Sequence, residues 1–123
     1  MAISVSSPAD FHVHLRQGHL TELTVPHVRE GGFHLAYVMV RSSYWNAALM
    51  KPHVLLQPNL KPPITTTEKA LKYKAELERI DSNVDYLMTL YLSPELTPEE
   101  IRKASAAGIV GMSTGLDDWR EGF

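Results

Sequence analysis

Two histidines and an arginine alternate along one short segment, Asp10 to Arg16 (DFHVHLR). Residues i, i+2 and i+4 of a β-strand share one face, so His12, His14 and Arg16 are predicted to point the same way. Two adjacent imidazoles can ligate one divalent metal, and a guanidinium beside them can bind a carboxylate. This spacing predicts metal-assisted chemistry on an anionic substrate. The intervening apolar side chains are predicted to lie on the opposite face: Phe11, Val13 and Leu15.

A His-x-His pair alone is weak evidence, because most such pairs are surface or hydrogen-bonded histidines. The position of this pair strengthens the metal interpretation, since it ends the first strand of an α/β pattern. Asp10 either orients a histidine or begins the strand, and we favour the second role. The other histidines have no metal-ligand spacing, and we expect them to be solvated or hydrogen-bonded: His19, His27, His34 and His53.

The elements that must position these residues alternate along the chain. Apolar runs predict strands at Phe11–Leu15, Phe33–Val40 and Val84–Leu92, and a fourth that begins at Ile109. Amphipathic patterns predict three helices between them. The first runs from about Leu20 to Glu30, the second begins near Thr65, and the third lies between Thr97 and Gly108.

The helix boundaries rest on capping residues. Thr65 and Glu68 have the spacing of a capping box, in which each side chain bonds the backbone of the other. Thr97 and Glu100 repeat that spacing. Pro26 disfavours the first helix, because proline lacks the N–H that a helix interior uses.

The order β-α-β-α-β-α-β predicts a parallel sheet with crossover helices. A TIM barrel needs eight such units, and this α/β chain supplies about three units and the start of a fourth strand. It is either a small open α/β domain or the N-terminal part of a (β/α)8 barrel. We treat residues 1–123 as one domain with two atypical segments, 40–57 and 112–123, that fit neither pattern.

Composition excludes several classes of protein. The 123 residues carry a formal net charge of −2, which gives no nucleic-acid footprint. The absence of cysteine excludes disulfides, thiolate metal sites and cysteine nucleophiles. No apolar run reaches the roughly 20 residues of a membrane span, and the first residues do not form a signal peptide. We therefore expect a cytoplasmic protein with no membrane or nucleic-acid partner.

Three motifs together resemble the dihydroorotase family of the amidohydrolase superfamily. They are Asp-Phe-His-Val-His-Leu-Arg-Gln-Gly from Asp10, Pro-Asn-Leu-Lys-Pro-Pro-Ile-Thr-Thr from Pro58, and Tyr-Leu-Met-Thr-Leu-Tyr-Leu from Tyr86. The resemblance is to the monofunctional, homodimeric type of fungi and many bacteria. It covers about Asp10 to Val110, apart from the segment 40–57.

The resemblance implies a (β/α)8 barrel with two zinc ions. It implies the reversible cyclisation of N-carbamoyl-L-aspartate to L-dihydroorotate in pyrimidine (UMP) biosynthesis. His12 and His14 match the first-strand metal ligands, and Arg16 and Asn59 match residues that bind the substrate carboxylate. A zinc-activated hydroxide suits amide chemistry, and the planar fork of Arg16 suits a carboxylate.

Two departures from the family pattern matter. The family continues Gly-Val-Lys on its fourth strand, and this lysine, when carboxylated, bridges the metals. Here the chain reads Gly111-Met112-Ser113, so the lysine is absent, and the catalytic aspartate and later histidines would lie beyond Phe123. The segment Val40–Gln57 separates two motifs that the family joins directly. We interpret both atypical segments as translated introns, and we expect this chain, which contains no catalytic residue, to be an inactive fragment.

Two alternatives remain open. Another cyclic amidohydrolase, of the hydantoinase or allantoinase kind, would share the His-x-His motif. A non-catalytic amidohydrolase-like module that binds or dimerises would share the fold without turnover.

Overall fold

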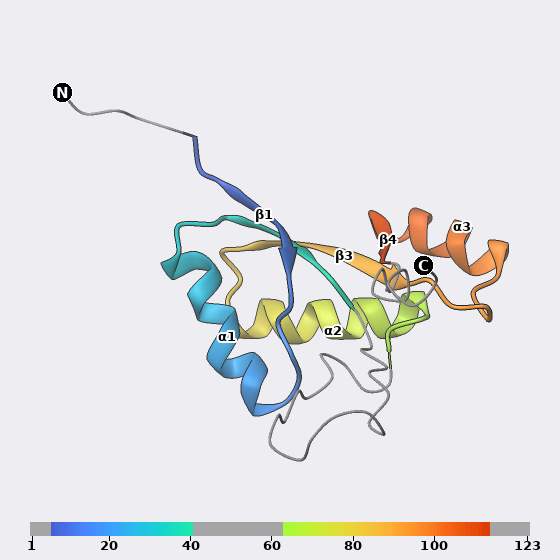
Figure 1. Ribbon diagram of the computed structural model, residues 1–123, viewed down its shortest axis with the longest axis horizontal. Helices are drawn as coiled ribbons and strands as arrows, with labels where there is room; N and C mark the ends of the chain where they lie inside the picture. The colour runs from blue at the N-terminus through green and yellow to red at the C-terminus, as the bar shows by residue number, and fades with distance from the viewer. Residues whose placement is uncertain (1–5, 41–62, 114–123) are drawn as a thin grey trace, which may run out of the picture.

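The computed structural model of the protein describes residues 6–40 and 63–113. Within these ranges, strands and helices alternate as β1-α1-β2-α2-β3-α3-β4. The described strands are parallel and lie in the order β1-β2-β3-β4, so each strand pairs with the next one along the chain. Figure 1 shows α1 and α2 below the sheet and α3 at its β4 end. The predicted α/β class with crossover helices is confirmed.

The strands follow the apolar runs of the sequence. Their bounds are Ala9–Val13 for β1, Leu35–Val38 for β2, Asp85–Tyr91 for β3 and Gly111–Ser113 for β4. The prediction of Phe11–Leu15 for β1 is wrong at both ends, because this strand begins and ends earlier. β4 includes Met112 and Ser113, the first two residues of an atypical segment.

The core lies between the sheet and the helices. β3 pairs with strands on both sides, and its side chains Tyr86, Met88 and Leu90 are almost fully buried. A strand with this much buried apolar surface is a main source of hydrophobic stabilisation. Helical side chains complete the same cluster: Val25, Val28, Ala70, Tyr73, Leu77 and Ala104.

The helices are α1 (His19–Glu30), α2 (Thr67–Ile80) and α3 (Pro98–Ala106). α1 continues through Pro26 despite the lost N–H, because Val25 and Val28 are buried and their packing offsets the poor local propensity. Among the described helices, none has the length and apolar character that a membrane span requires.

Both predicted capping boxes differ from the structure. The cap of α2 is Thr66, one residue later than predicted, and its hydroxyl accepts from the Lys69 N–H. Thr97 caps α3 as predicted, but the Glu100 carboxylate does not bond back to it. Instead Glu100 Oε1 accepts the Thr67 N–H at 2.6 Å. Packing of α3 on α2 brings Glu100 to the unpaired N–H groups that begin every helix.

Several predictions fall outside the described residues. Asn59 and His53 lie there, as does the second atypical segment beyond Ser113. Val40, which begins the first atypical segment, is described and fully buried.

Candidate metal and carboxylate site

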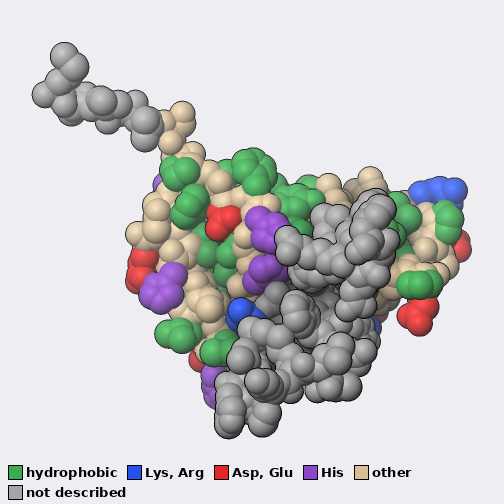
Figure 2. Space-filling model, viewed as in Figure 1, with side chains coloured by type: hydrophobic (Ala, Val, Ile, Leu, Met, Phe, Trp, Pro, Cys, Tyr) green, Lys and Arg blue, Asp and Glu red, His purple; other side chains and the backbone are tan. Residues whose placement is uncertain are grey.

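The two histidines of the opening motif lie side by side. Their ring centroids are 5.1 Å apart and their planes meet at 74°, an edge-to-face arrangement. His12 lies within β1 and is exposed, and His14 follows the strand and is half-buried. Figure 2 shows two histidine side chains together on this face, next to a positively charged side chain. The predicted proximity of the two imidazoles is confirmed.

A backbone carbonyl from the next strand restrains the His14 ring. His14 Nδ1 lies 3.3 Å from the carbonyl oxygen of Met39, the residue after β2. With the proton on Nδ1, the nitrogen that carries a lone pair is Nε2. Metal-binding histidines commonly use such a backbone contact to fix the tautomer and the ring orientation.

Asp10 acts on the strand and not on an imidazole ring. Its Oδ1 accepts the His12 backbone N–H at 3.0 Å. The pairing of β1 with β2 shifts register between Asp10 and Val13, where one extra residue on β1 forms a β-bulge. A bulge leaves an N–H without its ladder partner, and the Asp10 carboxylate satisfies it. Of the two predicted roles, the structure supports that of a strand residue.

The bulge also corrects the predicted alternation of faces. Leu15 is buried and Val13 packs against the core, as predicted for the apolar face. Phe11 does not join them, because 69% of it is exposed. The extra residue breaks the period of two at this point, so Phe11 does not share a face with Val13.

Arg16 departs most from the predicted geometry. β1 ends at Val13, and Arg16 has a φ of 63°, in the left-handed region. The prediction that His12, His14 and Arg16 share one face of a single strand is therefore wrong for Arg16. A non-glycine residue in this region costs about 1–2 kcal/mol, and such costs recur at functional sites.

Two helices bond the backbone on either side of Arg16. Thr24 Oγ1, on α1, donates to the Leu15 carbonyl at 3.0 Å, and the Tyr73 hydroxyl, on α2, donates to the Arg16 carbonyl at 2.6 Å. Burial, followed by the charge of Glu76, raises the pKa of Tyr73 well above its ordinary value, so its hydroxyl remains a donor. No sequence pattern predicted this contact between Tyr73 and the backbone of Arg16.

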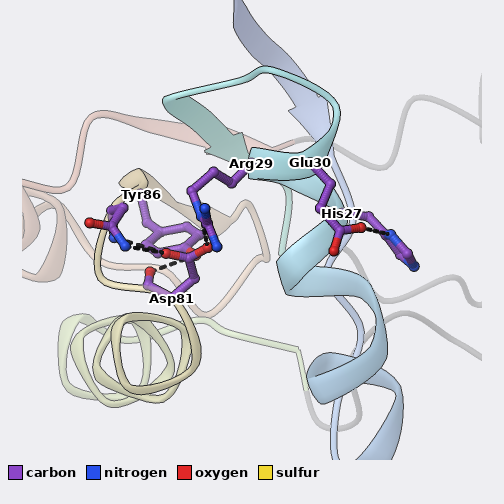
Figure 3. A network of polar contacts seen from close by, with 6 residues as sticks. His27, Arg29, Glu30, Asp81 and Tyr86 are labelled. Atoms are coloured by element: carbon purple, nitrogen blue, oxygen red, sulfur yellow. Dashed lines mark hydrogen bonds and ion pairs between the residues drawn. The ribbon is translucent and has the colours of Figure 1, made fainter.

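The remaining described histidines, His19, His27 and His34, are all exposed. His27 Nδ1 lies 2.8 Å from Glu30 Oε2 in a solvent-exposed pair on α1 (Figure 3). The prediction of solvated or hydrogen-bonded histidines holds for these residues.

A second polar cluster lies at the amino ends of the strands, and no sequence motif predicted it. Asp81 Oδ2 accepts from Arg29 Nε at 2.6 Å, and its Oδ1 accepts from the backbone and side chain of Asn83 (Figure 3). The hydrogen bond from the Arg29 side chain, followed by that from the Asn83 backbone, lowers the pKa of Asp81. The Asp81 carbonyl accepts the buried Tyr86 hydroxyl at 3.0 Å. This cluster joins α1, the end of α2 and β3.

The described residues fit a metal site only in part. No group of three or more His, Cys, Asp or Glu side chains that could hold a metal occurs within 6–40 and 63–113. A catalytic zinc ion has three protein ligands and an open position. The His12–His14 pair therefore has the donor chemistry of a zinc site but supplies two donors.

Comparison with known proteins gives one consistent result. No family model matches the chain. The chain is 46% identical over 112 residues to a dihydroorotase of Mycosarcoma maydis, covering 91% of the chain and 24% of that protein. It is 45% identical over 114 residues to a probable dihydroorotase of Schizosaccharomyces pombe, covering 93% of the chain and 28% of that protein.

Solved structures agree with the sequence relatives. The dihydroorotase of Saccharomyces cerevisiae, solved with 5-fluoroorotic acid, matches with a TM-score of 0.68 and 35% identity over 85% of this chain. The dihydroorotase of Campylobacter jejuni matches with a TM-score of 0.64 and 25% identity over 88% of this chain. The chain spans about a quarter of each, 24% and 27%. This chain is similar in sequence to the N-terminal portion of dihydroorotases, and its fold matches part of their TIM barrel.

Proposed function

We propose that this chain contributes the first strands of a dihydroorotase barrel and that the end of β1 forms part of its zinc site. The reaction is the reversible cyclisation of N-carbamoyl-L-aspartate to L-dihydroorotate in pyrimidine biosynthesis. The observation that carries the proposal is the edge-to-face pair of His12 and His14, with centroids 5.1 Å apart, in a relative of dihydroorotases. The proposal includes a small-molecule substrate, a homodimer of the family type and a cytoplasmic location.

The residues in and directly after β1 have separate roles in this proposal. His12 and His14 are the first-strand metal ligands, and the Met39 carbonyl orients the second of them. Zinc, when bound, supplies an activated water and polarises the amide carbonyl. Arg16 binds the substrate carboxylate through its planar fork, together with Asn59 from outside the described residues.

The proposed site needs ligands from elsewhere. The resemblance expects a carboxylated lysine where this chain has Ser113, at the end of β4. The Ser113 hydroxyl is buried and has no hydrogen-bond partner within the described ranges. A serine cannot supply the bridging carboxylate, so we expect this chain alone to bind zinc weakly and to show no measurable turnover. That expectation also keeps a non-catalytic module as the second candidate function.

Zinc titration followed through the histidine side-chain ¹⁵N resonances tests the proposal. We expect His12 and His14 to shift together, and His12→Asn to abolish the shift of His14. His27→Gln is the matched control, because His27 is a described histidine that lies on α1 and pairs with Glu30. Independent responses of His12 and His14, or equal responses at His27, would contradict a shared metal site.

A further inference from the structure

Arg16 is the one non-glycine residue with a positive φ among residues 6–40 and 63–113. Arginine rarely adopts this conformation, whereas Asn and Asp visit it more often because their short polar side chains can hydrogen-bond locally. Such an outlier persists only where the surrounding structure determines it, and it is a starting point for a functional hypothesis.

Two hydrogen bonds fix both backbone dihedrals of Arg16. The peptide plane before its Cα carries the Leu15 carbonyl, and the plane after it carries the Arg16 carbonyl. Thr24 holds the first plane at 3.0 Å, and Tyr73 holds the second at 2.6 Å. Because φ and ψ are the rotations of these two planes about one Cα, the pair of bonds determines the left-handed conformation.

Tyr73 is the stronger of the two restraints. Its bond is the shorter one, and its side chain is 5% exposed within the core cluster. A buried phenol with its proton retained must find an acceptor, so its hydroxyl stabilises the backbone geometry that presents one. The direction in which the Arg16 side chain leaves the backbone follows from that geometry, since φ and ψ orient the Cα–Cβ bond.

We propose that Tyr73 of α2 is a positioning residue for Arg16, holding it in the left-handed conformation from which its guanidinium binds the substrate carboxylate. The substrate carboxylate in this inference rests on the proposed function. The restraint on Arg16 rests only on the two hydrogen bonds. The helix behind the site, and not only the loop, then determines how tightly an anionic substrate binds.

The test compares Tyr73→Phe with Tyr86→Phe in the full 123-residue chain. Tyr86 is the matched control, because it is also buried and its hydroxyl also donates to a backbone carbonyl. That carbonyl belongs to Asp81, at the amino ends of the strands. Two quantities are measured by NMR: the backbone ¹³C shifts of Arg16, and the affinity for N-carbamoyl-L-aspartate. Arg16→Ala defines how much of that affinity depends on the guanidinium.

We expect Tyr73→Phe to move the Arg16 shifts out of the left-handed range and to weaken probe binding about fivefold, the effect of losing one hydrogen bond. Tyr86→Phe should lower the unfolding temperature about as much as Tyr73→Phe does. It should change neither the Arg16 shifts nor the affinity for the probe. If Tyr73→Phe fails to fold, Thr24→Val applies the same test to the other restraint.

The failures of the two proposals are distinguishable. Unmoved Arg16 shifts in Tyr73→Phe, or equal shifts in Tyr86→Phe, overturn the positioning role. If the unmodified chain and Arg16→Ala bind the probe equally, the carboxylate role of Arg16 in the proposed function is wrong. The Arg16 shifts then decide the role of Tyr73 by themselves.

Discussion

Polar groups are arranged differently at the two ends of the parallel strands. At the carboxyl end of β1, the rings of His12 and His14 lie side by side, and Arg16 adopts an unfavourable backbone conformation. At the amino end of β3, Asp81 is buried and bonded by Arg29 and Asn83, while its carbonyl accepts from Tyr86. The first arrangement includes backbone strain at Arg16, and the second joins α1, α2 and β3 through hydrogen bonds.

This division is the one that parallel α/β barrels use. Their active sites lie at the carboxyl ends of the strands, and the amino ends serve stability. Arg16 and Asp81 therefore predict opposite outcomes of mutation. Substitution of Asp81 should reduce stability, and substitution of Arg16 itself should reduce ligand binding without reducing stability.

Asp81→Ala should have the largest effect on stability. The substitution removes charged hydrogen bonds within a buried cluster, which predicts a loss of about 2 kcal/mol in the free energy of unfolding. The partner Arg29 is half-exposed and can return to water, so no buried charge is left behind. Urea unfolding followed by circular dichroism measures the loss.

Glu30→Ala is the control for this prediction, because it breaks the exposed His27–Glu30 pair, which should contribute almost nothing. Acid supplies a second check. The folded-state pKa of Asp81 is lowered, so its stabilisation is present above the unfolded pKa of about 3.9 and is lost as pH falls through the folded value. Asp81→Ala should flatten this acid limb, and an unchanged limb would refute the assigned role.

Arg16→Gly should have a smaller effect of the opposite sign. Glycine adopts a positive φ without strain, although it loses more entropy on folding, so we expect a gain of about 0.5 kcal/mol in the free energy of unfolding. Arg16→Ala is the matched control, since it removes the same guanidinium but keeps the strain. Equal stability of the two variants in urea unfolding would show that Arg16 is not strained.

The sequence predicted the strands and helices better than it predicted the geometry of the site. Apolar periodicity located β1, β2, β3 and the three described helices, because burial of one face determines which segments pack. It placed the start of β4 at Ile109, two residues before Gly111, where the strand begins. It misplaced the end of β1 and the face of Phe11, because a bulge between Asp10 and Val13 adds a residue without any signature in composition. The left-handed Arg16 was equally invisible, since an arginine gives no local signal for that conformation.

Long-range polar contacts explain the rest of what was missed. Glu100 has the spacing of a capping box, yet it bonds the Thr67 N–H on another helix. Arg29 and Asp81 are 52 residues apart in the chain, and neither belongs to a local motif. Such pairs depend on how helices pack, which the sequence pattern does not specify residue by residue.

A graft tests the central claim most directly. Residues 6–38 of this chain, which include β1, α1 and β2, would replace the aligned segment of the Schizosaccharomyces pombe relative. We predict that the chimera hydrolyses dihydroorotate, and that His12→Ala or His14→Ala lowers its rate at least about 100-fold, beyond the range typical of outer-shell residues. A folded, zinc-loaded chimera without activity, or one unaffected by either substitution, would contradict the account.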